Sequence, residues 1–311
     1  MPEKPPKSLK DIIVHLDTTE ASGRRVQAAV NLATAHGAHL TGVGVLYQPY
    51  IPAYAEAQIS LELIEQKLAA QRVALEEVSK AFAATADGAG ASAEWRVSDG
   101  EPVDVLGESA RYGDLTILSQ SEDTGEILPG GHEIPDRVLL TSGRPALVVP
   151  SIHDGAPFGK SIVVAWDASR MAARAVHYAM PLLQKADQVT IMVANPKPGV
   201  HGHGDLPGAD LAAHLARHGV AAEADHTVSD DVGIGDLLLS RAADAQADMI
   251  VLGAYGSRAV ARAGDGRRHP VHAGAHAAAS ADVALGGSAF RPACLRRRAG
   301  RARPAARRPG S

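Results

Sequence analysis

The sequence predicts an α/β protein with two tandem domains, each an open five-stranded parallel sheet flanked by helices. Short apolar runs typical of buried strands alternate with segments whose apolar residues recur at helical spacing, which indicates parallel strands joined by right-handed crossovers. The pattern restarts after about 150 residues, a period typical of a duplicated domain and too long for a solenoid repeat. Hydrophobic residues make up 45% of the chain but aromatic residues only 4%, so Ala, Val, Leu and Ile must fill the cores, as in parallel sheets.

The first domain is expected at residues 10–152, after a disordered start at residues 1–9. Its opening strand, DIIVHLD, is apolar and ends in an acid, and Thr19 or Ser22 is placed to cap the helix that follows. Pro102 suits the first turn of a later helix. The expected strands lie at 11–17, 39–47, 91–97, 114–119 and 145–150, and the later helices at about 56–84, 102–112 and 134–141.

A linker rich in Pro and Gly at residues 153–160 leads to the second domain, expected at residues 161–256. Its opening strand, SIVVAWD at 161–167, repeats the first strand of the chain together with the terminal acid. The remaining expected strands lie at 188–194, 222–228 and from 248 onward, and the helices at 169–183, 209–218 and 234–247. This domain is incomplete, because no pattern for a last helix and a last strand follows.

The last expected strand of the second domain ends in two glycines. Met249, Ile250, Val251 and Leu252 form an unbroken apolar run, which is followed by GAYG at 253–256. Ligands of open α/β sheets bind at the carboxyl ends of the strands, and a glycine there lets the backbone approach a ligand closely. A lone Gly-x-x-Gly is nevertheless a weak signal, and its value depends on the residues around it.

Both halves resemble universal stress protein domains, and the resemblance covers about residues 9–256. It rests on the strand-end acids Asp17 and Asp167, the strand-opening acids Asp114 and Asp248, and the Gly-x-x-Gly of residues 253–256. The resemblance implies a five-stranded parallel sheet in each domain and a dimer contact through the fifth strands. ATP-binding members of the family carry Gly-x-x-Gly, nine residues and then Gly-Ser or Gly-Thr around the phosphates, with the strand-end acid at the nucleotide pocket.

The resemblance therefore implies an ATP site in the second domain only, with Asp167, Gly253, Gly256 and Ser257 as its binding residues. The alternative for Asp167 is an acid placed at a helix N-terminus, where the helix dipole favours negative charge. In the first domain, Ser119, Gln120 and Ser121 replace the glycines, and Glu122 would repel phosphate. We therefore expect the first domain to bind no nucleotide and Asp17 to be structural.

The tail at residues 257–311 is expected to be disordered and to be read out of frame. It is rich in Arg and Ala and shows almost no apolar periodicity. A shift of one nucleotide from codon 262, with a suitable choice of third bases, yields ELVMGGVTRSMLAHMPLPVLMSH and then a stop codon. That peptide contains a glycine-rich loop with the family's spacing, a helix and a strand, so we expect a frameshift between residues 257 and 262.

The frameshift changes how the other features of the tail are interpreted. The basic charge after residue 257 becomes a by-product of codon usage, which predicts no specific nucleic-acid binding and only weak, salt-sensitive attraction to polyanions. His269, His272 and His276 are not expected to bind a metal, nor are His201 and His203 in their loop. A missing last strand would leave the strand near residues 145–150 uncovered, which predicts poor solubility or swapped dimers.

The chain lacks a Gly-x-Ser-x-Gly motif, a Walker lysine motif and a convincing Ser/His/Asp set, so dedicated catalysis is not expected. The single cysteine, Cys294, excludes an internal disulfide, and the sequence shows neither a signal peptide nor a membrane-spanning apolar run. We expect a cytoplasmic stress-response protein that binds ATP, with at most slow hydrolysis, and acts through protein partners or self-association. The alternative is an interaction and dimerisation module that binds no nucleotide.

Overall fold

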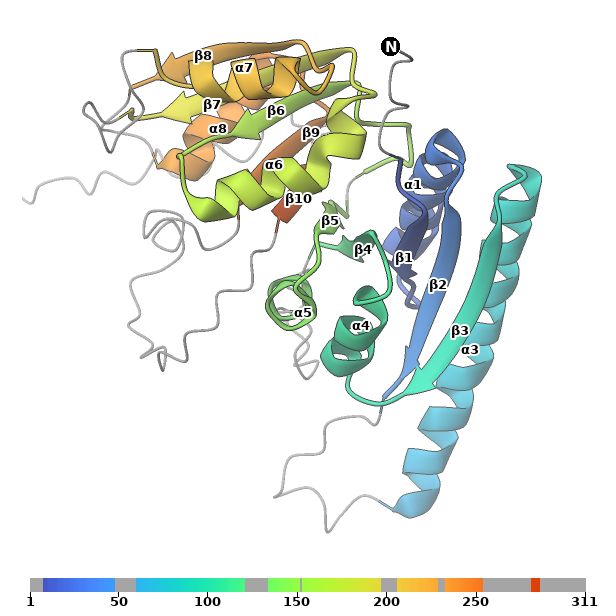
Figure 1. Ribbon diagram of the computed structural model, residues 1–311. Coiled ribbons are helices and arrows are strands. Elements are labelled where there is room, and N and C mark those ends of the chain that lie inside the picture. Colours follow the sequence, from blue (N-terminus) through green and yellow to red (C-terminus); the bar gives the residue numbers. More distant parts are fainter. Residues whose placement is uncertain are drawn as a thin grey trace, which may run out of the picture.

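The computed structural model describes residues 8–47, 60–120, 134–151, 153–196, 206–228, 233–253 and 281–285. Most of the expected disordered start, the second glycine Gly256, Ser257 and nearly all of the tail lie outside the described residues. Figure 1 shows the two halves of the chain side by side, each with its own strands and helices. Within the described residues, no helix has the length and apolar character needed to cross a membrane.

The first domain is a five-stranded parallel sheet with helices on both faces, as predicted. The strand order is β3-β2-β1-β4-β5, and every neighbouring pair is parallel. In chain order its elements are β1 (Asp11–His15), α1 (Glu20–His36), β2 (His39–Leu46), α3 (Leu61–Gly88), β3 (Ala93–Asp99), α4 (Pro102–Ala110), β4 (Leu115–Ser119), α5 (Ile134–Ser142) and β5 (Ala146–Val149).

The alternating side chains of the strands build a core on each face of this sheet. Ile12 and Val14 of β1 belong to the cluster that also contains residues of α1 and α3. Ile13, between them, belongs to the cluster formed with residues of α4 and α5. Because both faces are covered, the strands are almost continuously apolar, which is the pattern from which they were predicted.

The second domain repeats this arrangement with four parallel strands in the order β9-β6-β7-β8. Its elements are β6 (Ser161–Ala165), α6 (Arg170–Leu183), β7 (Gln188–Ala194), α7 (Ala209–Ala216), β8 (Ala222–Thr227), α8 (Ile234–Asp244) and β9 (Met249–Gly253). The prediction that this domain lacks a fifth parallel strand agrees with these pairings among the described residues.

The acids directly before β4 and β9 accept hydrogen bonds from the backbone at the start of the neighbouring strand, β1 or β6. Asp248 accepts hydrogen bonds from the backbone N–H groups of Gly159, Lys160 and Ser161 at 3.0–3.3 Å. Asp114 accepts the corresponding bonds from Lys10 and Asp11 at 2.7 and 3.2 Å. The repeat of these acids in the sequence therefore reflects a structural clamp that is used once in each domain.

The structure departs from the predicted disordered tail at β10 (Ala281–Leu285). This strand lies between the two domains, parallel to β5 and antiparallel to β9, and joins all strands into one ten-stranded sheet. Without β10, the edge strands β5 and β9 would have unpaired backbone groups. An extended segment between them can therefore pair with both. The expectation of an uncovered β5 edge is therefore wrong over Ala146–Val148, because β10 pairs with these residues.

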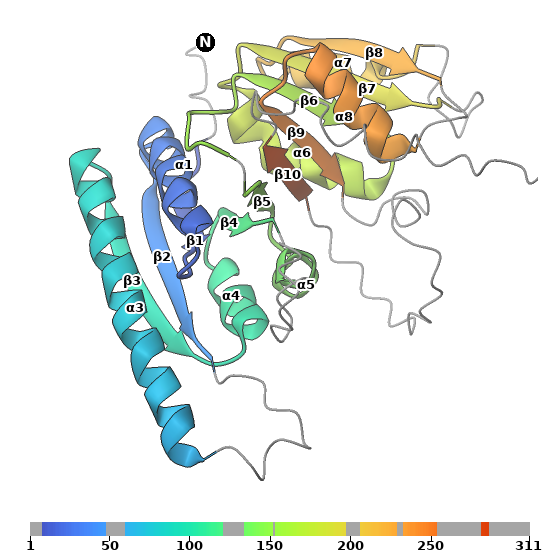
Figure 2. The same cartoon turned by 180° about the vertical axis from the view of Figure 1, so that it is seen from behind.

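The connection between the domains is docked on α1. The Arg24 guanidinium donates a hydrogen bond to the carbonyl of Ser151 at 2.8 Å, and the Asn31 amide donates to the carbonyl of Gly155 at 3.0 Å. Gly155 has a left-handed φ of 86°, and a Cβ there would lie 3.1 Å from Cβ of Gln27. Figure 2 shows the same arrangement from behind, with α1 next to the chain that leads to β6.

Candidate functional site

A cavity of about 270 Å³ lies at the carboxyl ends of β6, β7 and β9, next to the start of α8. This is the end of an open α/β sheet at which ligands bind. Its walls are mainly apolar, and only Asp167 among the lining residues is charged. The lining residues are Ala165, Trp166, Asp167, Met192, Ala194, Ile234, Gly235, Leu238, Leu239, Ile250, Leu252 and Gly253.

Asp167 lies at the rim of this cavity, where the chain passes from β6 to α6. The side chain is exposed, and its Oδ1 accepts a hydrogen bond from the backbone N–H of Ser169 at 3.0 Å. Ser169 in turn caps α6 by accepting a bond from the N–H of Ala172 at 3.1 Å. Ala168, between them, has a left-handed φ of 57°, so the acid is held in a tight, strained turn. Among the described residues, Asp167 makes no ion pair.

Gly253 also lines the cavity, but the structure gives a packing reason for the glycine. A Cβ at this position would lie 2.6 Å from the carbonyl carbon of Met171 and 2.6 Å from the backbone nitrogen of Ala172. The space that a side chain would fill therefore contains the first turn of α6. From the sequence we expected Gly253 to let a ligand approach the backbone closely, and that role remains a prediction. Gly256 and Ser257 lie outside the described residues.

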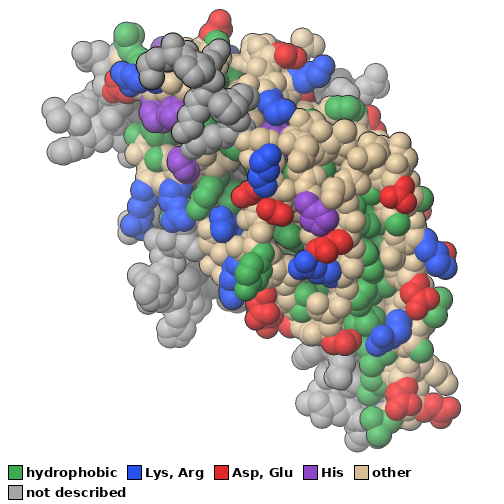
Figure 3. Space-filling model, turned by 45° about the vertical axis from the view of Figure 1, so that its right-hand side comes forward, with side chains coloured by type: hydrophobic (Ala, Val, Ile, Leu, Met, Phe, Trp, Pro, Cys, Tyr) green, Lys and Arg blue, Asp and Glu red, His purple; other side chains and the backbone are tan. Residues whose placement is uncertain are grey.

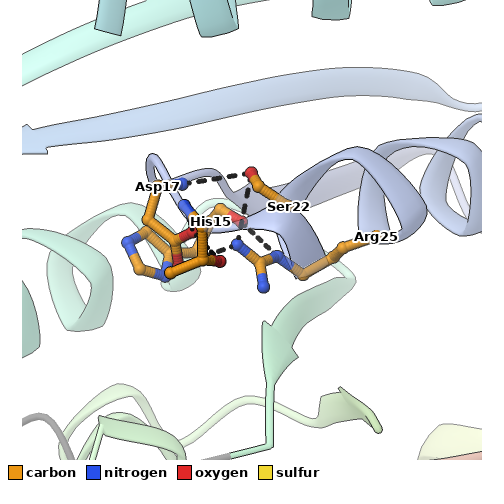
Figure 4. A network of polar contacts seen from close by, with 5 residues as sticks. His15, Asp17, Ser22 and Arg25 are labelled. Atoms are coloured by element: carbon orange, nitrogen blue, oxygen red, sulfur yellow. Dashed lines mark hydrogen bonds and ion pairs between the residues drawn. The ribbon is translucent and has the colours of Figure 1, made fainter. Parts of the chain in front are cut away.

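The corresponding corner of the first domain contains a polar network around Arg25, shown in Figure 4. The Arg25 guanidinium donates to the carbonyl of His15 at 2.6 Å and forms an ion pair with Asp17 at 3.0 Å. Ser22 Oγ accepts the backbone N–H of Asp17 at 3.2 Å, and Asp17 also accepts the N–H and hydroxyl of Thr19. The strand-end acid of the first domain is thus fully engaged by its own chain.

The charged groups of this network shift one another's pKa values. Arg25 is only 1% exposed. Burial raises the pKa of Asp17, but Arg25, with smaller contributions from His15 and Thr19, more than offsets it and holds the pKa below the ordinary value. Burial first, and then Arg25, lower the pKa of His15 to about 4. A neutral histidine, a carboxylate and a buried guanidinium therefore coexist at this corner near neutral pH.

The two halves differ at three equivalent positions around the shared acid. Because β1 and β6, and likewise α1 and α6, begin at matching positions of the repeat, Asp17 corresponds to Asp167. Alanine replaces three of the other members of the polar network in the second domain, whereas Ser169 stands in place of Thr19 and keeps the backbone hydrogen bond to the acid. The replacements are Ala165 for His15, Ala172 for Ser22 and Ala175 for Arg25. The second domain consequently has an exposed acid above an apolar cavity where the first domain has an internal ion pair.

Asp167 and Gly253 were predicted from the sequence, whereas Arg25 and the apolar residues that line the cavity were not. Trp166 and Met192 lie at the carboxyl ends of their strands, where the position in the strand was the only available signal. An alignment of the two halves shows that Ala175 stands in place of Arg25, but it does not show that Arg25 contacts Asp17. The expected start of the helix at 234–247 is confirmed, because α8 starts at Ile234 with Gly233 as its N-cap.

Among the described residues, no three His, Cys, Asp or Glu side chains lie close enough together to bind a metal ion. The candidate histidines of the tail and of the loop at 201–203 lie outside the described residues, so the expectation about them stays untested. With mainly apolar walls and a carboxylate at its rim, the cavity resembles sites for organic ligands, whose pockets are mostly apolar with a few polar groups at fixed positions.

Solved structures with similar folds include several universal stress proteins. A universal stress protein from Archaeoglobus fulgidus superposes over 80% of this chain and 87% of its own, with 17% sequence identity and a TM-score of 0.60. A universal stress protein in complex with cAMP covers 47% of this chain, with 23% identity, 99% of its own chain and a TM-score of 0.33. One from Archaeoglobus fulgidus in complex with dAMP covers 45%, with 15% identity, 96% of its own chain and a TM-score of 0.31.

Neither a family model nor a curated protein matches the sequence. The similarity to the first of these structures extends over both domains and shows the fold. The chain thus has the fold of a tandem universal stress protein, as the sequence predicted.

Proposed function

We propose that the second domain binds ATP and that the chain acts as a cytoplasmic stress-response protein through nucleotide-dependent contact with protein partners. The cavity at the ends of β6, β7 and β9 takes the adenine, and Asp167 accepts hydrogen bonds from the ribose hydroxyls. The triphosphate extends toward residues 254–257, where Gly256 and Ser257 follow β9 in the sequence.

The proposal rests on the difference between the two strand-end acids. Asp17 is neutralised by a buried arginine of its own helix, whereas Asp167 is exposed and has alanines around it. An acid that the fold uses for packing would be expected to keep its internal partner in both halves. The loss of that partner in the half that also has the cavity favours a ligand as the partner of Asp167.

The shape and chemistry of the cavity suit a purine nucleoside. The lining is apolar apart from the rim, and Trp166 and Met192 offer flat, polarisable surfaces for a base. At about 270 Å³, the cavity lies just below the range of ~300–1,000 Å³ typical of small-ligand pockets. Such a volume can take the base and part of the sugar, so the phosphates must lie outside it.

Phosphate binding is the part of the proposal that depends on the tail. Phosphates are bound by clusters of backbone N–H groups in glycine-rich loops and at helix N-termini. We propose that the reading frame shifts between residues 257 and 262 and that the restored frame supplies the missing glycine-rich loop. The chain as printed then retains the base and ribose part of the site with a weakened phosphate part.

Hydrolysis, if the site performs it, is slow in this proposal. The carboxylate of Asp167 is the one charged group that lines the cavity, and its role there is to orient the ribose. No dedicated acid, base or nucleophile set lines the cavity among the described residues, so binding rather than turnover is the proposed activity.

Tryptophan fluorescence tests this proposal directly, because one of the two tryptophans lines the cavity. In a Trp95→Phe background, Trp166 is the remaining tryptophan, and we expect its emission to change saturably with ATP. Asp167→Ala should weaken binding about tenfold or more, since it removes hydrogen bonds to a charged acceptor.

The matched control is Asp244→Ala, which removes the same charge at the opposite end of α8 from the cavity. It should leave the ATP affinity unchanged. An emission that stays constant up to millimolar ATP, or an equal loss of affinity in both variants, contradicts the proposed site.

A further inference from the structure

The helix α3 extends beyond the sheet on which it packs. It has 28 residues, and its fully buried side chains, Leu75, Phe82 and Ala86, all lie in its C-terminal half. The N-terminal turns run past the ends of β2 and β3, as Figures 1 and 2 show. Leu61 is 78% exposed there, and Val73 is 60% exposed.

The apolar residues of α3 follow a stripe along its length that one polar residue, Gln71, interrupts. Their spacing alternates between three and four residues, which is the heptad pattern of helices that pair with other helices. The stripe comprises Leu61, Ile64, Leu68, Gln71, Leu75, Val78 and Phe82. Its C-terminal half faces the sheet of its own domain and is buried at Leu75 and Phe82, whereas in its N-terminal half Leu61 is exposed and Ile64 and Leu68 are half-buried.

A groove of about 400 Å³ lies beside this stripe, between α3 and the edge of the sheet. Its floor contains Leu75, Trp95 and Val97, and its charged lining residues are Arg72, Glu76 and Lys80. Trp95 lies flat along β2 because Gly44 has no side chain, since a Cβ there would be 2.7 Å from the indole ring. Figure 3 shows hydrophobic side chains in a band on this side that reaches the lower end of the molecule.

We propose that two copies of the chain associate through α3, in an antiparallel arrangement with two-fold symmetry. The N-terminal turns of each α3 lie in the groove of the other copy. Ile64 of one copy is then level with Leu75 of the second copy, and Leu68 is level with its Gln71. Each copy contributes both the protruding turns and the groove, so the same surface is used on both sides, as a two-fold interface requires.

The charges beside the stripe fit this arrangement. In an antiparallel pair with this register, Glu65 of one copy lies next to Arg72 of the second copy, and the contact occurs twice. Among the described residues, neither Glu65 nor Arg72 has an ion-pair partner in its own copy. Lys80, by contrast, is already paired with Glu77 at 2.7 Å. The groove thus offers Arg72, which lies beside Glu76, as an unpaired cation with which Glu65 of the protruding turns can pair.

Sedimentation equilibrium of the full chain tests the proposal. We expect a reversible dimer, and Leu61→Glu or Leu68→Glu should weaken it about tenfold or more, because each places a charge in an apolar interface. Leu61 is largely exposed in the single copy, so the melting temperature of a Leu61→Glu variant should stay near that of the unaltered chain. The control Asp87→Lys, at the C-terminal end of α3, should leave the dimer unchanged.

Charge reversal separates this interface from a general loss of fold. Glu65→Arg and Arg72→Glu should each weaken the dimer about fivefold, and the double variant should restore most of the affinity. In a Cys294→Ser background, Leu68→Cys combined with Gln71→Cys should form disulfides between two chains under mild oxidation.

A chain that stays monomeric at concentrations up to about 100 µM, a range in which a micromolar dimer would be detected, overturns the proposal and leaves the stripe to another protein or to the chain itself. A dimer that survives Leu61→Glu and Leu68→Glu also overturns it, because the contact then lies elsewhere. Failure of the double charge reversal to restore affinity contradicts the antiparallel register.

Discussion

Arg25 and Ala175 show how one residue can decide whether a strand-end acid is structural. The guanidinium of Arg25 reaches back from the second turn of α1 to the end of β1 and neutralises Asp17. In the second half, a methyl group takes the place of the guanidinium, and Asp167 faces solvent. The same backbone thus builds an internal clamp in one domain and an open acid in the other.

Arg25→Ala should destabilise the first domain by about 3 kcal/mol, because it leaves a largely buried carboxylate without its partner. The measurement is the free energy of unfolding in urea. Arg217→Ala, which removes an exposed arginine after α7, is the control and should change stability by less than about 0.5 kcal/mol. A similar effect of the two substitutions would mean that the ion pair with Asp17 contributes little.

The buried His15 predicts how stability depends on pH. Its pKa is lowered to about 4 in the folded chain by burial and by Arg25, against the ordinary 6.5. The unfolded chain therefore binds more protons between these values, so the stabilisation present above pH 6.5 is lost progressively as the pH falls toward 4. His36, lowered to about 4 by burial and by Lys185, acts in the same direction.

Replacing His15 by glutamine should reduce the loss of unfolding free energy between pH 7 and pH 5. The exposed His177 provides the control, since His177→Gln should leave that loss unchanged. The measurement is urea unfolding at the two pH values. An equal loss in the His15→Gln variant and the unaltered chain would contradict the role of this histidine.

At the scale of elements, the end of β9 and the first turn of α6 are packed backbone to backbone at Gly253. Gly253→Ala would place a Cβ 2.6 Å from two backbone atoms of α6, which have no room to move independently. We expect a loss of about 1–3 kcal/mol of stability, as for other overpacked positions. Thermal unfolding measures it.

Gly23→Ala in α1 is the matched control for this substitution. No atom lies within 4 Å of a Cβ at Gly23, and alanine favours a helix over glycine, so stability should stay the same or rise by about 0.5–1 kcal/mol. If Gly253→Ala were tolerated as well as Gly23→Ala, the packing reason for Gly253 would be wrong.

At the scale of the whole molecule, the sequence predicted the strands of both domains, their parallel arrangement within each domain and the duplication. These features follow from local apolar periodicity and from the repeat of DIIVHLD as SIVVAWD, both of which are visible without a structure. The clamps made by Asp114 and Asp248 repeat for the same reason.

Other features depended on contacts between distant segments and could not be predicted. The pairing of β10 depends on two sheet edges that belong to different domains. The walls of the cavity come from β6, β7, β9 and α8 together, and no single stretch of sequence contains them. Arg25 meets Asp17 because a helix turns its side chain back over the strand end, a geometry that the spacing of the two residues does not reveal.

We propose that the two halves differ in function because, among the described residues, the second domain has an open acid above a cavity and the first has an internal ion pair. Resequencing codons 250–290 and titrating ATP calorimetrically into the chain with the restored frame tests it most directly. We expect the chain with the restored frame to bind one ATP, more tightly than the chain with the given sequence does. Asp167→Ala should weaken this binding. Two ATP molecules per chain, or none, would contradict the proposal.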